Sequence, residues 1–270
     1  MQTQYMINGK REACLTPMDR GFAYGDGVFR TFPVKQGVPQ CWERHYARLS
    51  EDCKALRIVC PPAHTLLGEI AHLCQGDTAV AVKVVITRGE SGRGYAPPPL
   101  AQPTRVVIKS PLPDYPERNF SEGVHLHLCE VRLGFQPALA GIKHLNRLEN
   151  VLARMEWVDA SLADGLLLDA EGHVVECTMS NLIMRCGNAV ITPDLSRCGV
   201  AGVTRQRILE ILGGQGYRVE VASFDLDALW QADEVIICNS LFGAWQVRSV
   251  SGHTWSLGTL AAMLRGHLGA

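Results

Sequence analysis

Apolar and polar residues follow two different periods along the first 110 residues. Between residues 43 and 57 the apolar side chains recur at steps of three and four, which places them on one face of a helix. A second helix is expected at residues 65–74. Residues 79–87 and 105–109 are rich in valine and isoleucine and short enough to form buried strands. This part of the chain is predicted to combine a sheet with two helices.

Two turns and one loop are expected between these elements. Asn8-Gly9 supplies the positive φ angles of a tight hairpin, so the chain should open with two paired strands. A second strand pair is expected on either side of residues 35–37. Residues 88–95 combine three glycines with charged side chains, so they are expected to form a loop.

Three prolines, at positions 111, 113 and 116, interrupt the pattern after residue 110. Each lacks a backbone donor and has a fixed φ, which suits a linker better than the interior of an element. A chain of 270 residues is long enough for two modest lobes. We therefore predict a small N-terminal lobe, a linker and a larger C-terminal lobe, at residues 1–110, 111–118 and 119–270.

Closely spaced short strands characterise the second lobe. They are expected at residues 124–128, 166–169, 174–176, 182–184, 190–192 and 234–238. Gly-containing turns separate several of them. Strands clustered in this way favour an α+β fold over a doubly wound parallel sheet.

Two helices are expected in the second lobe, at residues 147–158 and 203–212. Asn146 and Glu149 are suited to a capping-box-like start of the first, and Gly213-Gly214 is expected to stop the second. Three apolar side chains of the first helix are expected to face a core, namely Leu148, Leu152 and Met155.

The charge balance excludes one class of partner. Lys and Arg number 26 against 27 Asp and Glu, so no basic surplus is available to bind a phosphate backbone or an anionic membrane. No apolar run approaches the ~18 residues needed to cross a bilayer, and the first residues lack the apolar stretch of a secretory signal. We expect a cytoplasmic protein that binds neither nucleic acid nor membrane.

The ten cysteines form no C-x-x-C pair, so we interpret them as scattered reduced thiols. His125 and His127 would share one face of a strand, but no third ligand lies nearby in the sequence. No metal site is expected.

The common nucleotide-binding and hydrolase motifs are missing: there is no G-x-x-x-x-G-K-[ST], no G-x-G-x-x-G after a strand and no G-x-S-x-G. The informative stretch is residues 140–150, where Lys143 stands just before a predicted helix. A lysine in this place is, in isolation, most often a solvated surface charge. Its interpretation depends on the rest of the chain.

Seven separate segments, in the same order, resemble the fold-type IV pyridoxal-phosphate enzymes, a group that contains branched-chain and D-amino-acid transaminases and 4-amino-4-deoxychorismate lyases. The resemblance is closest to the lyase branch at residues 92–95 and 143–149, where Leu148 occupies the position at which transaminases typically carry a tyrosine. It implies a two-lobe architecture with the cofactor lysine on the larger lobe. The segments are residues 22–29, 45–49, 88–95, 141–149, 176–181, 199–205 and 233–240.

The resemblance implies that Lys143 forms a Schiff base with pyridoxal 5'-phosphate. A primary amine holds the aldehyde reversibly and, once displaced by the substrate, is a positioned base. Glu176 is expected to hydrogen-bond the pyridine nitrogen and keep it protonated. Without the family pattern, Glu176 would be read as an exposed carboxylate at a strand end.

Several residues match the family's phosphate and cofactor contacts. Arg48 offers a two-pronged guanidinium to phosphate oxygens, although an isolated helix arginine is usually just exposed. Gly202, Val203 and Thr204 begin a predicted helix, whose free N–H groups and dipole attract an anion. Ser240 matches a further phosphate-side hydroxyl and Asn181 a polar position in the cofactor pocket, although both types are also common in turns.

Residues 88–95 lie where the family places a segment that faces the substrate. Arg93 and Tyr95 are candidates to bind a substrate carboxylate. A plain flexible surface loop is the competing interpretation. Arg30 is a further substrate candidate, and the sequence leaves open whether its side chain points inward or outward.

The lyase branch implies a reaction and partners. Such an enzyme converts 4-amino-4-deoxychorismate to 4-aminobenzoate and pyruvate on the route to folate, by Schiff-base formation, proton abstraction and elimination of pyruvate, and is commonly a homodimer. The nearest alternative is a transaminase for branched-chain or D-amino acids, which would use the same Lys143 and Glu176. A third possibility is a non-catalytic protein that keeps the fold for storage or partner binding.

Overall fold

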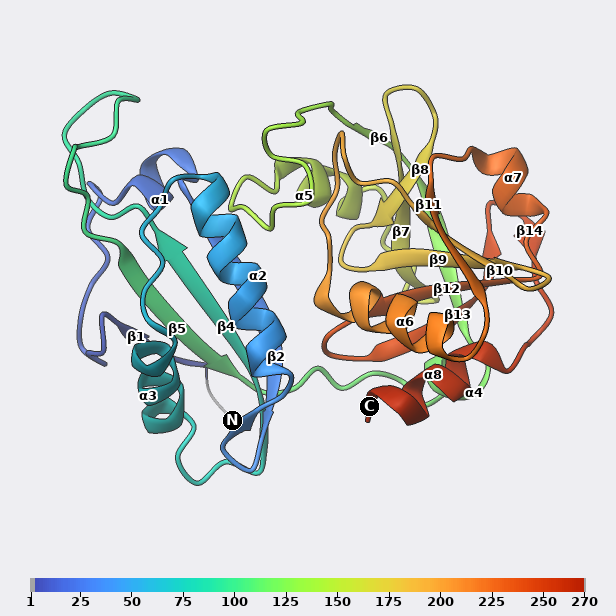
Figure 1. The fold of residues 1–270 in the computed structure, drawn as a ribbon, viewed down its shortest axis with the longest axis horizontal. Coiled ribbons are helices and arrows are strands. Elements are labelled where there is room, and N and C mark those ends of the chain that lie inside the picture. Colours follow the sequence, from blue (N-terminus) through green and yellow to red (C-terminus); the bar gives the residue numbers. More distant parts are fainter. Residues whose placement is uncertain (1–2, 270) are drawn as a thin grey trace. The chain divides into compact units, whose positions relative to one another are not determined.

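The computed structural model describes residues 3–269, which form two compact units (Figure 1). The first unit contains the described residues up to Pro113 together with Ile142–Asn146. The second contains Asp114–Gly141 and the described residues from Arg147 onward. The first break between them falls inside the stretch that we expected to be a linker. Ile142–Asn146, which carries Lys143, groups with the first unit although it lies in the stretch that we assigned to the larger lobe.

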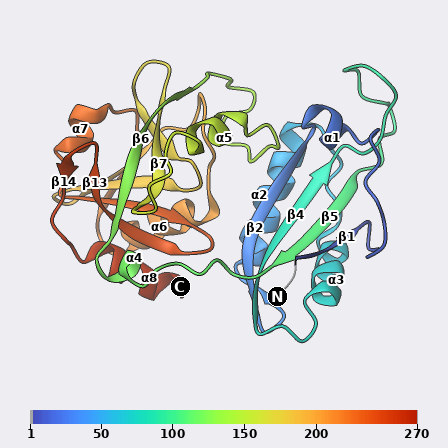
Figure 2. The same ribbon diagram turned by 180° about the vertical axis from the view of Figure 1, so that it is seen from behind.

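A five-stranded antiparallel sheet forms the first unit, with strand order β1-β5-β4-β2-β3 (Figure 2). Its strands are β1 (Gln4–Ile7), β2 (Gly27–Lys35), β3 (Val38–Pro39), β4 (Ala79–Thr87) and β5 (Thr104–Ser110). Its helices are α1 (Arg20–Tyr24), α2 (Trp42–Ala55) and α3 (Ala63–Leu73). Even-numbered residues of β2 and β4, such as Phe32 and Val82, share one core with Leu49 of α2 and Ile70 of α3. Both helices therefore cover the same face of the sheet.

The predicted helices and most strands of this unit are confirmed, including the pairing of β2 with β3 across Gln36-Gly37. The opening hairpin was wrong. Asn8 and Gly9 do adopt positive φ angles, but only a single bridge, between Ile7 and Lys10, follows the turn. β1 pairs with β5 instead. The residues after the turn lack the alternation of apolar and polar residues that is typical of a strand, whereas β1 can pair with the edge of β5 that β4 does not occupy.

The second unit contains a nine-stranded mixed sheet of order β11-β10-β9-β12-β13-β6-β7-β8, with β14 paired to β13. The pairs β10–β11, β13–β6 and β6–β7 are parallel. Val174 of β8 and Leu182 of β9 share a core with Trp245 of β13, so the sheet curls around its own interior. The strands are β6 (Val124–Leu133), β7 (Leu162–Asp169), β8 (Val174–Cys177), β9 (Asn181–Cys186), β10 (Ala189–Pro193), β11 (Arg218–Ala222), β12 (Glu234–Asn239), β13 (Gly243–Val250) and β14 (His253–Thr254).

Five helices complete this unit: α4 (Arg118–Ser121), α5 (Leu148–Arg154), α6 (Val203–Gly214), α7 (Leu226–Trp230) and α8 (Leu260–Leu268). α6 and α8 pack together on the sheet, since Leu212 and Leu264 share a core with Ile183 of β9. The α+β class predicted from the clustered strands is confirmed. The elements of this unit that were not predicted are β11, β13, β14, α4, α7 and α8. No helix in the described part of the chain is long and apolar enough to cross a membrane.

Three features of the predicted helices were wrong. α5 has no capping box: Asn146 donates to the carbonyl of Gly25, and Glu149 accepts from the N–H of Gly134. α6 runs through Gly213-Gly214 instead of stopping before them. The apolar residues expected to face a core from α5 and its C-terminal end are exposed, with exposed fractions of 75% for Leu148, 54% for Leu152 and 72% for Met155.

Candidate active site

Lys143 lies on a short segment that runs beside the start of β2. Its carbonyl accepts from the N–H of Phe29 at 2.9 Å, and Leu145 donates to the carbonyl of Gly27 at 3.0 Å. An antiparallel bridge joins Val28 to His144 between these two hydrogen bonds. Residues 143–145 are therefore held against β2 by β-type pairing, which fixes the backbone of Lys143 from its carbonyl onward.

A buried acid adds a further contact to this backbone. Asp52 of α2 is 1% exposed, and its Oδ2 accepts from the N–H of Lys143 at 3.2 Å. The same oxygen pairs with Nη2 of Arg30, which is 3% exposed. Burial lowers the pKa of the Arg30 guanidinium, and the charge of Asp52 opposes that effect. Arg30 points inward and forms a buried ion pair with Asp52, and its role as a substrate ligand stays a prediction.

Two ammonium groups lie against the ring of Phe29. Nζ of Lys143 is 4.7 Å from the ring centroid, and Nζ of Lys83 is 4.6 Å from it. Burial lowers the pKa of Lys83. We did not single out Lys83 or Asp52 from the sequence. The available signals were one charged residue in the valine-rich β4 and one acid on the buried stripe of α2.

Arg48 and Arg30 form a local concentration of positive charge in the first unit. Arg48, on α2, is half-buried and pairs with Glu51 through Nη1 at 2.7 Å. Its charge adds to the effect of burial in lowering the pKa of Arg30. Nε of Arg30 is buried and has no hydrogen-bond partner among the described residues. An anion here would offset the repulsion between the guanidinium groups, so these residues fit a phosphate.

Glu176, on β8 in the second unit, is a buried carboxylate within a hydrogen-bond network. Its Oε2 accepts from the N–H of Val200 at 2.8 Å and from Nδ2 of Asn181 at 3.5 Å. Asn181 also donates to the carbonyl of Val200 at 2.7 Å and accepts from the N–H of Gly202 at 3.1 Å. Asn181 thus links the carboxylate to the start of α6. A carboxylate buried away from water is stabilised by a charged N–H donor, such as a protonated ring nitrogen.

The start of α6 has the features of an anion site. Gly202 is its N-cap and provides no side-chain acceptor for the N–H groups of the first turn, which includes Val203. Oγ1 of Thr204 lies 3.1 Å from Oγ of Ser240, so the two predicted phosphate-side hydroxyls are brought together. A Cβ at residue 202 would lie 2.2 Å from Oδ1 of Asn181, which explains why this position holds a glycine and no larger residue.

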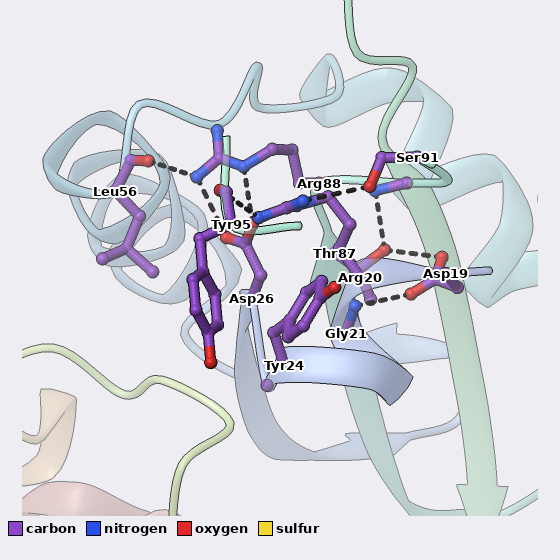
Figure 3. Close-up of polar contacts among 12 residues, drawn as sticks. Asp19, Arg20, Gly21, Tyr24, Asp26, Leu56, Thr87, Arg88, Ser91 and Tyr95 are labelled. Carbon is purple, nitrogen blue, oxygen red and sulfur yellow. Dashed lines mark hydrogen bonds and ion pairs between the residues drawn. The ribbon is translucent and has the colours of Figure 1, made fainter. Parts of the chain in front are cut away.

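The loop after β4 carries the two remaining candidates. Arg93 is exposed and makes no hydrogen bond or ion pair with any other residue between 3 and 269. Tyr95 is 85% exposed, and its ring centroid is 5.4 Å from that of Tyr24 (Figure 3). Both side chains are available to a ligand.

Three comparisons with known proteins cover nearly all of these residues. Residues 27–250 match the family described as amino-transferase class IV. The aminodeoxychorismate lyase of Vibrio harveyi is 38% identical over 268 residues, which cover 98% of this chain and 99% of the relative.

Solved structures agree with the sequence relatives. The crystal structure of 4-amino-4-deoxychorismate lyase from Pseudomonas aeruginosa matches with a TM-score of 0.94 at 46% identity, over 98% of this chain and 97% of that chain. The branched-chain amino acid aminotransferase of Escherichia coli matches with a TM-score of 0.86 at 20% identity, over 98% of this chain and 93% of that chain. The second likeness is one of fold alone.

Proposed function

Because the chain belongs to the amino-transferase class IV family, we propose that it is a pyridoxal-phosphate-dependent lyase that converts 4-amino-4-deoxychorismate to 4-aminobenzoate and pyruvate in folate biosynthesis. One observation carries the proposal: two proteins named for this lyase match almost the full chain at 38% and 46% identity. Leu148, at the position where transaminases typically carry a tyrosine, agrees with it.

Each candidate residue has its own expected role in binding the cofactor. Lys143 would bind it covalently, and Glu176 would hydrogen-bond its ring nitrogen, with Asn181 orienting the carboxylate. The proposed phosphate ligands are Arg48, the Thr204 and Ser240 hydroxyls, and the backbones of Gly202 and Val203 at the N-terminus of α6. When bound, the cofactor supplies an electron sink for the charge left by a departing proton.

Proton movement falls to Lys143. Its amine removes the proton from the substrate carbon that bears the amino group, and the neighbouring enolpyruvyl ether oxygen then leaves. Aromatisation of the ring makes this elimination strongly favourable. Asp52 keeps the lysine backbone in place through the N–H contact, and Arg93 and Tyr95 bind a substrate carboxylate.

We further propose a cytoplasmic homodimer. All ten cysteines are free thiols, which suits a reducing compartment. The apolar residues exposed at α5 follow a helical spacing of three and four and form one stripe, which we call the α5 stripe: Leu148, Val151, Leu152 and Met155. A contiguous apolar stripe on a surface is typical of a protein contact, and a second copy of the chain is the proposed partner.

Product analysis tests the lyase proposal. The protein loaded with pyridoxal 5'-phosphate is mixed with enzymatically generated 4-amino-4-deoxychorismate, and 4-aminobenzoate and pyruvate are measured by chromatography. We expect equal amounts of both, and a loss of roughly 10³-fold or more in Lys143→Ala, because that change removes both the covalent anchor and the base.

A second assay, in which an amino acid and 2-oxoglutarate are supplied, separates the alternative. A transaminase would give sustained turnover of an amino acid with 2-oxoglutarate and no equimolar release of the two products. A cofactor-binding protein that forms no 4-aminobenzoate, or a Lys143→Ala variant with near-normal turnover, would contradict the proposal.

A further inference from the structure

The guanidinium of Arg20, the first residue of α1, is tied to the loop after β4 (Figure 3). Arg20 is 4% exposed. Its Nη1 donates to Oγ of Ser91 and to the carbonyl of Gly94, both at 3.0 Å, and its Nη2 donates to the carbonyl of Tyr95 at 2.8 Å. Its Nε donates to Oδ2 of Asp26 at 2.8 Å. Every nitrogen of the guanidinium is engaged within the protein.

A second arginine holds Asp26 from another direction. Arg88 donates to Oδ2 of Asp26 through Nε at 2.7 Å and to Oδ1 through Nη2 at 2.9 Å. It also donates to the carbonyls of Leu56 and Arg57, both at 2.8 Å, which follow α2. Burial alone would raise the pKa of Asp26, but the two arginines outweigh it and hold that pKa below its ordinary value. The carboxylate that orients Arg20 is therefore ionised and fixed.

Backbone hydrogen bonds fix the same loop at three more points. The N–H of Arg20 donates to the carbonyl of Gly89 at 2.9 Å, and the N–H of Ser91 donates to the carbonyl of Met18 at 3.1 Å. The N–H of Gly94 donates to Oη of Tyr24 at 3.1 Å. Ser91 and Gly94 are thus anchored on either side of Arg93, whose side chain is exposed and has no partner in the described chain.

We propose that Arg20 is a positioning residue for substrate binding. It fixes Ser91, Gly94 and Tyr95, and so aims Arg93 and Tyr95 at a carboxylate of the substrate. Arg20 acts through the loop and does not touch the substrate. The inference rests on the proposed function, since it takes the ligand of the loop to be the carboxylate-bearing substrate.

The chemistry of the contact explains why the residue is an arginine. A planar guanidinium reaches a carboxylate, a hydroxyl and two carbonyls at once, whereas the ammonium of a lysine is a point charge. Arg20→Lys would keep the pairing with Asp26 and lose the fork that spans Ser91, Gly94 and Tyr95. This conservative change therefore tests the positioning of the loop while the positive charge beside Asp26 is kept.

Trypsin provides a readout that needs neither cofactor nor substrate. Cleavage after Arg93 requires the anchored segment to open locally. We expect Arg20→Lys to speed this cleavage by about tenfold, in proportion to the larger open population. The matched control is Arg105→Lys, which disturbs a partly buried arginine pair with Glu69 in the same unit and should leave the cleavage rate unchanged.

Kinetics with 4-amino-4-deoxychorismate then test the link to the substrate. Arg20→Lys should raise KM by about tenfold with kcat within about twofold, because ground-state and transition-state binding of the carboxylate weaken together. Cofactor affinity, measured by absorbance titration, should not change. In an Arg93→Ala background the same change should raise KM far less, since the group that it positions is already missing.

The possible results separate the anchoring of the loop, its link to the substrate and the proposed function. Unchanged cleavage after Arg93 in Arg20→Lys would overturn the anchoring, and faster cleavage with an unchanged KM would overturn the link to the substrate. Additive effects of Arg20→Lys and Arg93→Ala on KM would also contradict the proposal. If the wild-type enzyme formed no 4-aminobenzoate, the proposed function would fail, while faster cleavage of Arg20→Lys would still support the anchoring of the loop.

Discussion

Asp52 serves two donors of different kinds, the guanidinium of Arg30 and the backbone N–H of Lys143. A buried carboxylate in this position neutralises a buried cation and fixes the lysine. The two roles share one oxygen atom, so a change at this residue affects stability and the site together.

We predict that Asp52→Asn destabilises the protein by about 3 kcal/mol, because Arg30 would be left as a buried charge without its partner. The free energy of unfolding from denaturant titration measures this effect. The matched control is the neighbouring Glu51→Gln, which removes an exposed pair with Arg48 and should cost about 0–1 kcal/mol. Equal losses in the two variants would contradict a structural role for the buried pair.

The start of α6 depends on a glycine with a neighbour too close for a side chain. Gly202→Ala would place a Cβ 2.2 Å from Oδ1 of Asn181, so the N-cap and the N–H groups that follow it must shift. We predict about tenfold weaker binding of pyridoxal 5'-phosphate, measured by absorbance titration, because aligned N–H groups favour the phosphate.

Gly214→Ala, at the other end of α6, is the control for this change. A Cβ there meets no atom within 4 Å, and alanine has the higher helix propensity. Its cofactor affinity should equal that of the wild type. A loss of affinity as large as that of Gly202→Ala would attribute the effect to the helix as a whole instead of its N-terminus.

The elements that could be predicted from the sequence are those whose apolar residues recur with a clear period and are also buried. α2, α3 and β4 have a clear apolar period and were found from the sequence. α5 shows the same period, but its apolar residues are exposed, because periodicity identifies an apolar face without identifying what covers it.

The candidate site was predictable only as far as the family motifs reached. Lys143, Glu176 and Arg48 were assigned from the resemblance, and no local pattern distinguishes them from surface charges. Asp52 and Lys83 were missed because their partners come from distant parts of the chain. The inward direction of Arg30 is set by its even-numbered place on β2, which is visible only once the face covered by α2 is known.

For the assembled protein, the α5 stripe predicts association of two copies. Leu152→Glu combined with Met155→Glu would place two charges on the stripe, and we expect a monomer at micromolar concentration in analytical ultracentrifugation, because charge is strongly disfavoured in the core of an interface. Leu257→Glu, at an apolar residue of similar exposure between β14 and α8, should leave the dimer intact. A dimer in the double variant would place the interface elsewhere.

The return of Ile142–Asn146 to the first unit has a consequence for synthesis. Chains emerge from the ribosome from the N-terminus onward, so the partner of Val28 and Phe29 becomes available only after residues 114–141 have been made. The first unit is therefore finished late, when β6 already exists but neither of its sheet neighbours, β7 and β13, has appeared. No fragment that stops at Pro113 contains the lysine, so the enzyme cannot be divided there into a self-sufficient first half.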